Sequence, residues 1–130
     1  IRTAHGVVYA FPIQDAFGDL PAIDLSAVYP VSRKDPAAPP VAVAAVTLRA
    51  DQDVSAGDVT AALEALDPEQ RPDVVHVVDE IPLTTWYRPT TGALRAAGLP
   101  KIRRPARAWT LDADRRRYVP LTAALRDGLS

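Results

Sequence analysis

One segment of the sequence gathers side chains that are suited to binding an anion. Residues 79–89 read Asp-Glu-Ile-Pro-Leu-Thr-Thr-Trp-Tyr-Arg-Pro, a stretch of hydroxyl and aromatic side chains that includes the cation Arg88. Functional residues concentrate on exposed loops held by rigid elements, and a guanidinium binds a carboxylate or a phosphate through two parallel hydrogen bonds. This segment is therefore the candidate functional loop. The alternative is a surface turn whose Trp86 packs on the domain.

The composition excludes several kinds of chemistry. The chain has 130 residues, no cysteine and two histidines, His5 and His76, which excludes disulfides, thiolate catalysis, Cys-ligated zinc and polyhistidine metal sites. Fifteen basic and sixteen acidic residues give a net charge of -1, which argues against a nucleic-acid binder that relies on bulk positive charge. Only Lys34 and Lys101 could supply lysine chemistry, and we expect both to be solvated. No Gly-rich phosphate-binding loop follows any predicted strand.

The start of the sequence and its apolar runs indicate how many domains to expect and whether a segment spans a membrane. No apolar run approaches the roughly 20 residues that span a bilayer, and no signal peptide opens the chain. The sequence lacks methionine and begins Ile1-Arg2-Thr3, without a helix cap. We therefore expect a single domain that belongs to a longer protein.

Hydrophobic and turn patterns predict the elements that hold the candidate loop. The predicted strands are a short pair within 1–9 that turns at His5-Gly6, then 23–31, 41–48, 73–78, and a final pair at 108–111 and 117–119. The predicted helices are 12–18, a helix from the Ser55 capping box to just before Pro68, 90–98 and about 121–128. The order indicates an α+β fold: a small central sheet flanked by helices, with short N-terminal and C-terminal strand pairs.

Side-chain alternation gives further expectations for these strands. Residues 41–48 are nearly all apolar, which is typical of a strand covered on both faces. The residues expected on one face of the strand 23–31 are Ile23, Leu25, Ala27 and Tyr29. His76 points away from Val75 and Val77, either onto an exposed face or as a half-buried, hydrogen-bonded side chain without a catalytic role. We expect Trp109 and Tyr118 to hold the tail on the sheet.

The candidate loop resembles the C-terminal end of the adenylate-forming enzymes, which include acyl-CoA synthetases, luciferases and nonribosomal peptide adenylation domains. The likeness lies in Val-Asp-Glu-Ile-Pro-Leu-Thr at 78–84, a cation four residues later, and Ala-Leu-Arg at 93–95. In that family a small C-terminal domain carries a P-x-T-x-x-G-K loop, whose lysine bonds the substrate carboxylate and an ATP phosphate. Pro82 and Thr84 match this motif, and Arg88 stands at the lysine position.

The resemblance extends along the chain. Arg2 and Gly6 fall where the family has an arginine and a glycine just after its interdomain hinge, and the segments 20–31, 41–48 and 70–75 resemble successive family strands. Three tail segments are similar to the ending of very-long-chain acyl-CoA synthetases and fatty acid transport proteins: Gly-Leu-Pro at 98–100, Trp-Thr-Leu-Asp at 109–112 and Tyr-Val-Pro-Leu-Thr at 118–122. This branch, with an Arg- and Ala-rich composition, suggests a bacterial fatty-acid CoA ligase.

The resemblance implies that residues 1–130 are a single C-terminal lid domain of a larger acyl-CoA ligase, whose N-terminal domain binds ATP and the acyl substrate. It implies ATP, Mg²⁺ and CoA as cofactors of the full-length enzyme and none for the isolated domain, which we expect to be inactive. Arg88 and Thr84 are the implied catalytic residues, and Arg2, His5 and Gly6 form the implied loop for the CoA step. The implied partners are the N-terminal domain, fatty acid and CoA, without nucleic acid or a bound metal. The expected location is the cytoplasm, with peripheral membrane association as an option.

Departures from the family pattern keep other functions open. Arg88 replaces the lysine and Tyr87 replaces the glycine, while Pro12 and Gln14 stand where the family has an acidic pair. One alternative is a degenerate, non-catalytic lid that serves binding or regulation, and a further alternative is an unrelated α+β interaction module. The basic clusters 103–107 and 115–117 could contact a CoA phosphate or an anionic membrane. Solvated clusters balanced by Asp112 and Asp114 are the simpler interpretation.

Overall fold

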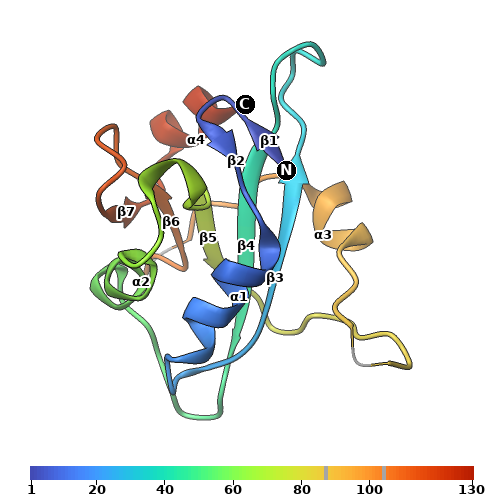
Figure 1. Cartoon of the computed structure of the whole chain (residues 1–130), viewed down its shortest axis with the longest axis vertical. Helices are drawn as coiled ribbons and strands as arrows, with labels where there is room; N and C mark the ends of the chain where they lie inside the picture. The colour runs from blue at the N-terminus through green and yellow to red at the C-terminus, as the bar shows by residue number, and fades with distance from the viewer. Residues whose placement is uncertain (87, 104) are drawn as a thin grey trace.

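The computed structural model describes residues 1–86, 88–103 and 105–130. Figure 1 shows how the two sheets and the helices are arranged within these ranges. The elements are β1 (Arg2–Thr3), β2 (Gly6–Val7), α1 (Ala10–Gly18), β3 (Ile23–Val31), β4 (Val41–Leu48), α2 (Ala56–Leu63), the short 3-10 helix η1 (Pro68–Gln70), β5 (Val74–Val77), α3 (Gly92–Ala97), β6 (Ala108–Leu111), β7 (Tyr118–Pro120) and α4 (Ala123–Leu129).

The central sheet has the strand order β3-β4-β5-β6-β7. The pair β4–β5 is parallel and is joined through α2, whereas the pairs β3–β4, β5–β6 and β6–β7 are antiparallel. β1 and β2 form a separate two-stranded hairpin. The α+β prediction is thus confirmed, and the predicted C-terminal strand pair continues the central sheet because β6 pairs with β5.

Both faces of the sheet are covered. The first face packs against α1 and α2, whose buried residues Ile13, Phe17, Val59 and Leu63 belong to one core cluster. The second face packs against Leu94 of α3 and the C-terminal end of α4 in another cluster. Alternate residues of β4 enter each cluster, and every residue from 41 to 47 is buried. The prediction that this apolar run is covered on both faces is confirmed, because each face has its own helices.

A bulge in β3 overturns one prediction about side-chain direction. Ile23 pairs with Leu48 while Ser26 pairs with Val46, so β3 has one residue more than β4 between these two pairs. One extra residue in a strand exchanges the sheet faces to which the side chains point on the part of the strand that precedes it. Ile23 therefore packs in the cluster with α1 and α2, whereas Tyr29 packs on the other face. The prediction that Ile23 shares a face with the alternating residues up to Tyr29 is wrong.

The helix ends follow local chemistry, with small differences from the predicted limits. Ser55 and Asp58 form the predicted capping box: the Asp58 N–H donates to the Ser55 hydroxyl at 3.1 Å and the Ser55 N–H donates to the Asp58 carboxylate at 2.9 Å. α1 begins at Ala10 rather than at residue 12. Pro12 fits inside the first turn, because the N–H group that proline lacks would have no intrahelical partner there. α3 is shorter than predicted and ends before Gly98, which has a φ of 76°. In the described ranges, the helices are too short or too polar to cross a membrane.

Candidate functional site

The candidate loop leaves β5 and returns to α3 as an irregular hairpin that projects from the body of the molecule (Figure 1). Ile81 anchors its start, because its side chain is 4% exposed and packs in the core cluster on the α3 face. Leu83 and Pro89 form an antiparallel bridge, and the Thr90 N–H donates to the Pro82 carbonyl at 2.8 Å. These contacts hold the outgoing and returning segments side by side.

Thr84 and Arg88 meet within this hairpin. The Thr84 N–H donates to the Arg88 carbonyl at 2.8 Å, and the Arg88 N–H donates to the Thr84 hydroxyl at 3.1 Å. The Thr84 hydroxyl also accepts a hydrogen bond of 3.3 Å from the Trp86 N–H. The Thr84 side chain therefore shapes the backbone that carries Arg88, a positioning task that suits the threonine at this place in the loop.

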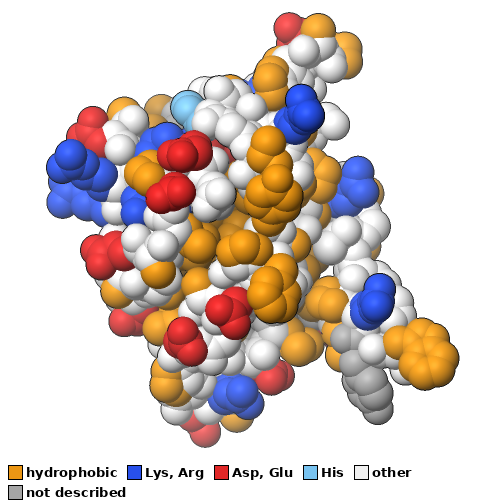
Figure 2. Space-filling model, viewed as in Figure 1, with side chains coloured by type: hydrophobic (Ala, Val, Ile, Leu, Met, Phe, Trp, Pro, Cys, Tyr) orange, Lys and Arg blue, Asp and Glu red, His pale blue; other side chains and the backbone are white. Residues whose placement is uncertain are grey.

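The side chains of the loop point outwards. Trp86 is 85% exposed, so the alternative that it packs on the domain is wrong. Arg88 is exposed, and its guanidinium has no hydrogen bond or ion pair with any other residue in the described ranges. Figure 2 shows the loop as a protrusion that carries hydrophobic and basic side chains. Tyr87, which replaces the family glycine, lies outside the described residues.

The predicted CoA-step residues lie in the β1–β2 hairpin. Arg2 and His5 are exposed, and Gly6 has a φ of 151°, which favours glycine. A Cβ atom on Gly6 would lie 3.1 Å from the Glu69 Cβ, so this glycine also allows η1 to pack closely against the hairpin. Figure 1 places the hairpin and the Arg88 loop at opposite ends of the molecule. The two predicted groups of site residues are therefore not brought together.

The basic cluster 115–117 differs from its predicted solvated state. Arg115 forms an ion pair of 3.1 Å with Asp73, and the exposed fractions of the two side chains are 14% and 7%. Arg115 also donates to the carbonyls of Pro68 and Arg71. Among these three arginines, Arg117 is the one that forms an ion pair with Asp112, at 3.5 Å. The interpretation of all three arginines as solvated charges balanced by Asp112 and Asp114 is thus wrong for Arg115, because its long side chain reaches back across the sheet.

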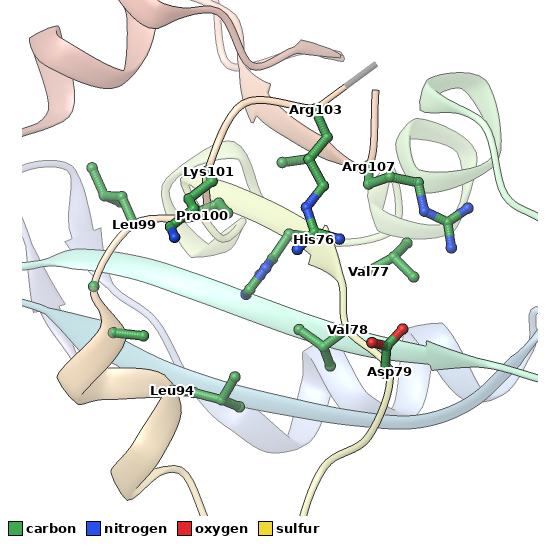
Figure 3. A pocket seen from close by; sticks show the side chains of 13 residues that line it. His76, Val77, Val78, Asp79, Leu94, Leu99, Pro100, Lys101, Arg103 and Arg107 are labelled. Carbon is green, nitrogen blue, oxygen red and sulfur yellow. The ribbon is translucent and has the colours of Figure 1, made fainter. Parts of the chain in front are cut away.

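A cavity that sequence reasoning did not find lies beside β5 and α3 (Figure 3). Its volume is about 340 Å³, and its lining includes His76, Lys101 and Arg103. His76 is 9% exposed, and the Tyr29 hydroxyl and the His76 Nε2 atom lie 2.6 Å apart. Burial, and secondarily the positive charge of Arg103, lowers the pKa of His76 to about 4. Strand alternation gave the direction of His76, but no local signal shows that residues 29 and 76 meet across β4.

Similar folds occur in solved structures of synthetases. The amide bond synthetase McbA from Marinactinospora thermotolerans matches 75% of this chain with a TM-score of 0.62 and 23% identity, over 19% of its own chain. The ATP-bound RpMatB-BxBclM chimera B3 matches 75% with a TM-score of 0.63 and 26% identity, again over 19% of its chain. A fatty acyl CoA synthetase from Mycobacterium tuberculosis matches 75% with a TM-score of 0.62 and 19% identity, over 19% of its chain.

These matches establish the fold. This chain spans about one fifth of the length of each of these three solved structures. Its fold is therefore shared with a small part of much larger chains, in agreement with the resemblance to adenylate-forming enzymes at the level of the superfamily. Because synthetases with different substrates match equally well, the matches do not single out the very-long-chain branch. No protein-family model and no curated protein matches the sequence significantly.

Proposed function

We propose that this chain is the C-terminal lid domain of an ATP-dependent acyl-CoA ligase, and that the ligase acts on fatty acids. The observation that carries the proposal is the shared fold, in which about three quarters of this chain superimposes on about one fifth of each matched synthetase. One of these is a fatty acyl CoA synthetase and another has ATP bound. The fatty-acid substrate rests further on the sequence of the tail, which resembles the very-long-chain branch.

Arg88 acts in the adenylation step. Bound ATP would supply the adenylyl group to the carboxylate of the acyl substrate, with pyrophosphate as the leaving group. The Arg88 guanidinium, presented by the hairpin and free of other partners among the described residues, holds the carboxylate and the phosphate together and stabilises the charge that develops between them. Thr84 keeps the backbone of residue 88 in place through its hydroxyl. A guanidinium is planar, forked and wider than an ammonium, so Arg88 can bind both anions through parallel hydrogen bonds but lacks the compact reach of a lysine ammonium.

The larger chain completes the site. In the part of the chain that the structure describes, no group of three or more His, Asp or Glu side chains could hold a metal ion. In this proposal the domain contributes the cationic Arg88, and the N-terminal domain binds ATP and Mg²⁺. Rotation about a hinge before Ile1 then presents the hairpin of Arg2, His5 and Gly6 to the thioester step with CoA, because domain motions commonly complete a catalytic site and exclude water from it.

Exposed aromatic side chains support contact with a second domain. Tyr9 is 58% exposed and Phe11 76% exposed, directly after the β1–β2 hairpin, and Trp86 stands out from the candidate loop. Large apolar side chains grouped on a surface are typical of sites that another protein surface covers. Their positions next to the two predicted groups of site residues suit a lid that presents each end to the N-terminal domain in turn.

The test measures the two half-reactions of the full-length ligase separately. We expect Arg88→Ala to slow acyl-adenylate formation by at least about a hundredfold, as loss of one charge-stabilising donor typically does. The thioester step, started from preformed acyl-adenylate, should change little, and Arg88→Lys should keep or raise the adenylation rate. Arg95→Ala is the matched control, because Arg95 is an exposed arginine on α3. Equal adenylation rates in the wild type and Arg88→Ala would overturn the proposal for Arg88.

That same result would favour the second candidate function, a degenerate lid kept for binding or regulation. The observations behind it are Arg88 at the lysine position and Pro12 and Gln14 at the positions of the acidic pair. A full-length protein that forms no acyl-adenylate with any fatty acid, while its N-terminal domain binds ATP, would establish this alternative.

A further inference from the structure

The cavity beside β5 is lined by more positive than negative charge. Lys101, Arg103 and Arg107 line it, whereas Asp79 is the single carboxylate among its lining residues. Arg107 is partly neutralised, because it forms an ion pair of 3.1 Å with Asp53. In the described ranges, the side chains of Lys101 and Arg103 make no hydrogen bond or ion pair. Two cations without partners therefore face the same space.

His76 adds a hydrogen-bonding group to the floor of this cavity. Its Nε2 atom is paired with the Tyr29 hydroxyl, and its Nδ1 atom has no partner in the part of the chain that is described. Every fully buried side-chain nitrogen or oxygen of the described residues has a hydrogen-bond partner. The unpaired Nδ1 atom is therefore not fully buried, and His76 is among the residues that line the cavity. Figure 3 shows Arg103 reaching down towards the His76 ring.

The remaining walls are apolar. Val78, Leu94 and Leu99 line the side nearest α3, and their own packing belongs to the core cluster of that face. The volume of about 340 Å³ lies in the range of small-molecule sites. At roughly 30 Å³ for each water molecule in the liquid, a space of this size holds more than an inorganic ion. An apolar wall beside two cations suits a ligand with an anionic end and an apolar body.

We propose that this cavity binds a phosphate monoester, with its phosphate between Lys101, Arg103 and the His76 ring and its organic part against Val78, Leu94 and Leu99. A phosphate monoester carries nearly two negative charges at pH 7, which matches the two cations without partners. The site is separate from the Arg88 loop and does not depend on adenylation by the full-length protein. Its ligand enters beside α3, where the cavity lining is open to solvent.

The burial of His76 beside Tyr29 determines the protonation state of the imidazole that this ligand contacts. The groups that face His76 are Tyr29 from β3, Asp79 after β5, and Lys101, Arg103 and Arg107 from the segment before β6. The imidazole is neutral at pH 7, so one of its nitrogens donates and the other accepts. With an anion in the cavity, the tautomer that has its proton on Nδ1 is favoured. The Tyr29 hydroxyl then donates to Nε2, and Nδ1 donates to the phosphate.

Nuclear magnetic resonance of the imidazole nitrogens tests the site. The 130-residue chain is titrated with phenyl phosphate and, in parallel, with inorganic phosphate at constant ionic strength in chloride. We expect a saturable shift of the His76 signals towards the Nδ1–H tautomer, with a midpoint for phenyl phosphate at least about threefold lower, since its ring also buries apolar surface. His5 is the other histidine of the chain and is exposed, so it serves as the internal reference.

Two double variants with the same change in net charge distinguish binding at this site from general electrostatic attraction of the phosphate to the protein. Lys101→Ala with Arg103→Ala should raise the midpoint at least about tenfold, because it removes both unpaired cations. Arg116→Ala with Arg117→Ala removes two exposed arginines of the β6–β7 turn and should leave the midpoint within about twofold. All four side chains are exposed, so the variants should keep the wild-type backbone spectrum. Absence of a saturable His76 shift, equal weakening by both variants, or equal midpoints for the two ligands would overturn the proposal.

Discussion

His76 gives the clearest residue-level consequence of the fold, because its imidazole resists protonation in the native state. Its pKa of about 4 lies below the ordinary value of 6.5, so between these pH values the unfolded chain binds a proton that the folded chain does not. The free energy of unfolding must then fall as the pH falls through this range. The contribution of His76 is fully present above pH 6.5 and has been lost at about pH 4.

We therefore expect the wild-type chain to lose about 2 kcal/mol of stability from this residue between pH 7 and pH 5, at about 1.4 kcal/mol for each pH unit below 6.5. His76→Gln removes the titrating group and keeps a side chain that can hydrogen bond to Tyr29. Urea denaturation of both proteins at the two pH values measures the difference. An equal loss of stability in wild type and variant would show that His76 is accessible enough to titrate normally.

At the scale of the elements, Arg115 ties the β6–β7 turn to the segment that leads into β5. Arg115 has a φ of 57°, which is unusual for a residue with a side chain. The turn is held by the ion pair with Asp73, and by the Arg71 guanidinium, which donates to the Arg115 carbonyl at 2.6 Å. Asp73 in turn accepts a hydrogen bond of 2.9 Å from the N–H of Ala42, at the start of β4. One carboxylate thus links β4, β5 and the β6–β7 turn.

Removing Arg115 leaves this buried carboxylate without its cation. We expect Arg115→Ala to lower the free energy of unfolding by about 3–5 kcal/mol, the usual cost of breaking a buried ion pair from one side. Arg117→Ala is the control, because that side chain is 76% exposed and its pair with Asp112 should contribute no more than about 1 kcal/mol. Denaturation of the two variants at pH 7 compares them. A loss below about 1 kcal/mol for Arg115→Ala would mean that the Asp73 carboxylate is satisfied by water.

Local elements were predictable from the sequence, and long-range contacts were not. The capping box at Ser55 depends on residues three apart, and the burial of β4 on both faces follows from an unbroken apolar run; both predictions are confirmed. The bulge that redirects Ile23 depends on pairing with β4, and the ion pair of Arg115 with Asp73 joins residues 42 apart. The Tyr29–His76 contact is likewise set by strand order rather than by spacing. The loop of Arg88 was proposed as a candidate site from its motif and stays a prediction, whereas the cavity became visible only when the strands were in place.

At the scale of the whole molecule, the tail is part of the central sheet and should be as stable as the sheet. β6 lies between β5 and β7, and Trp109 and Tyr118 are 4% and 3% exposed. The Tyr118 hydroxyl donates to the Pro72 carbonyl at 2.6 Å, which ties β7 to the segment before β5. Opening the tail would therefore expose part of the core that also holds α2, so the tail and the main strands should unfold together.

We expect the 130-residue chain to fold on its own and to protect the amides of β6 and β7 from hydrogen exchange to the same degree as those of β4 and β5. Amides that open only with global unfolding share its free energy, whereas weakly supported elements open locally. The β1–β2 hairpin supplies the internal contrast, because its two short strands pair only with each other and should exchange faster. Hydrogen exchange read by nuclear magnetic resonance distinguishes these segments residue by residue. Rapid exchange over residues 106–122 together with slow exchange in β4 would mean that the tail opens separately and needs the rest of a longer chain to hold it.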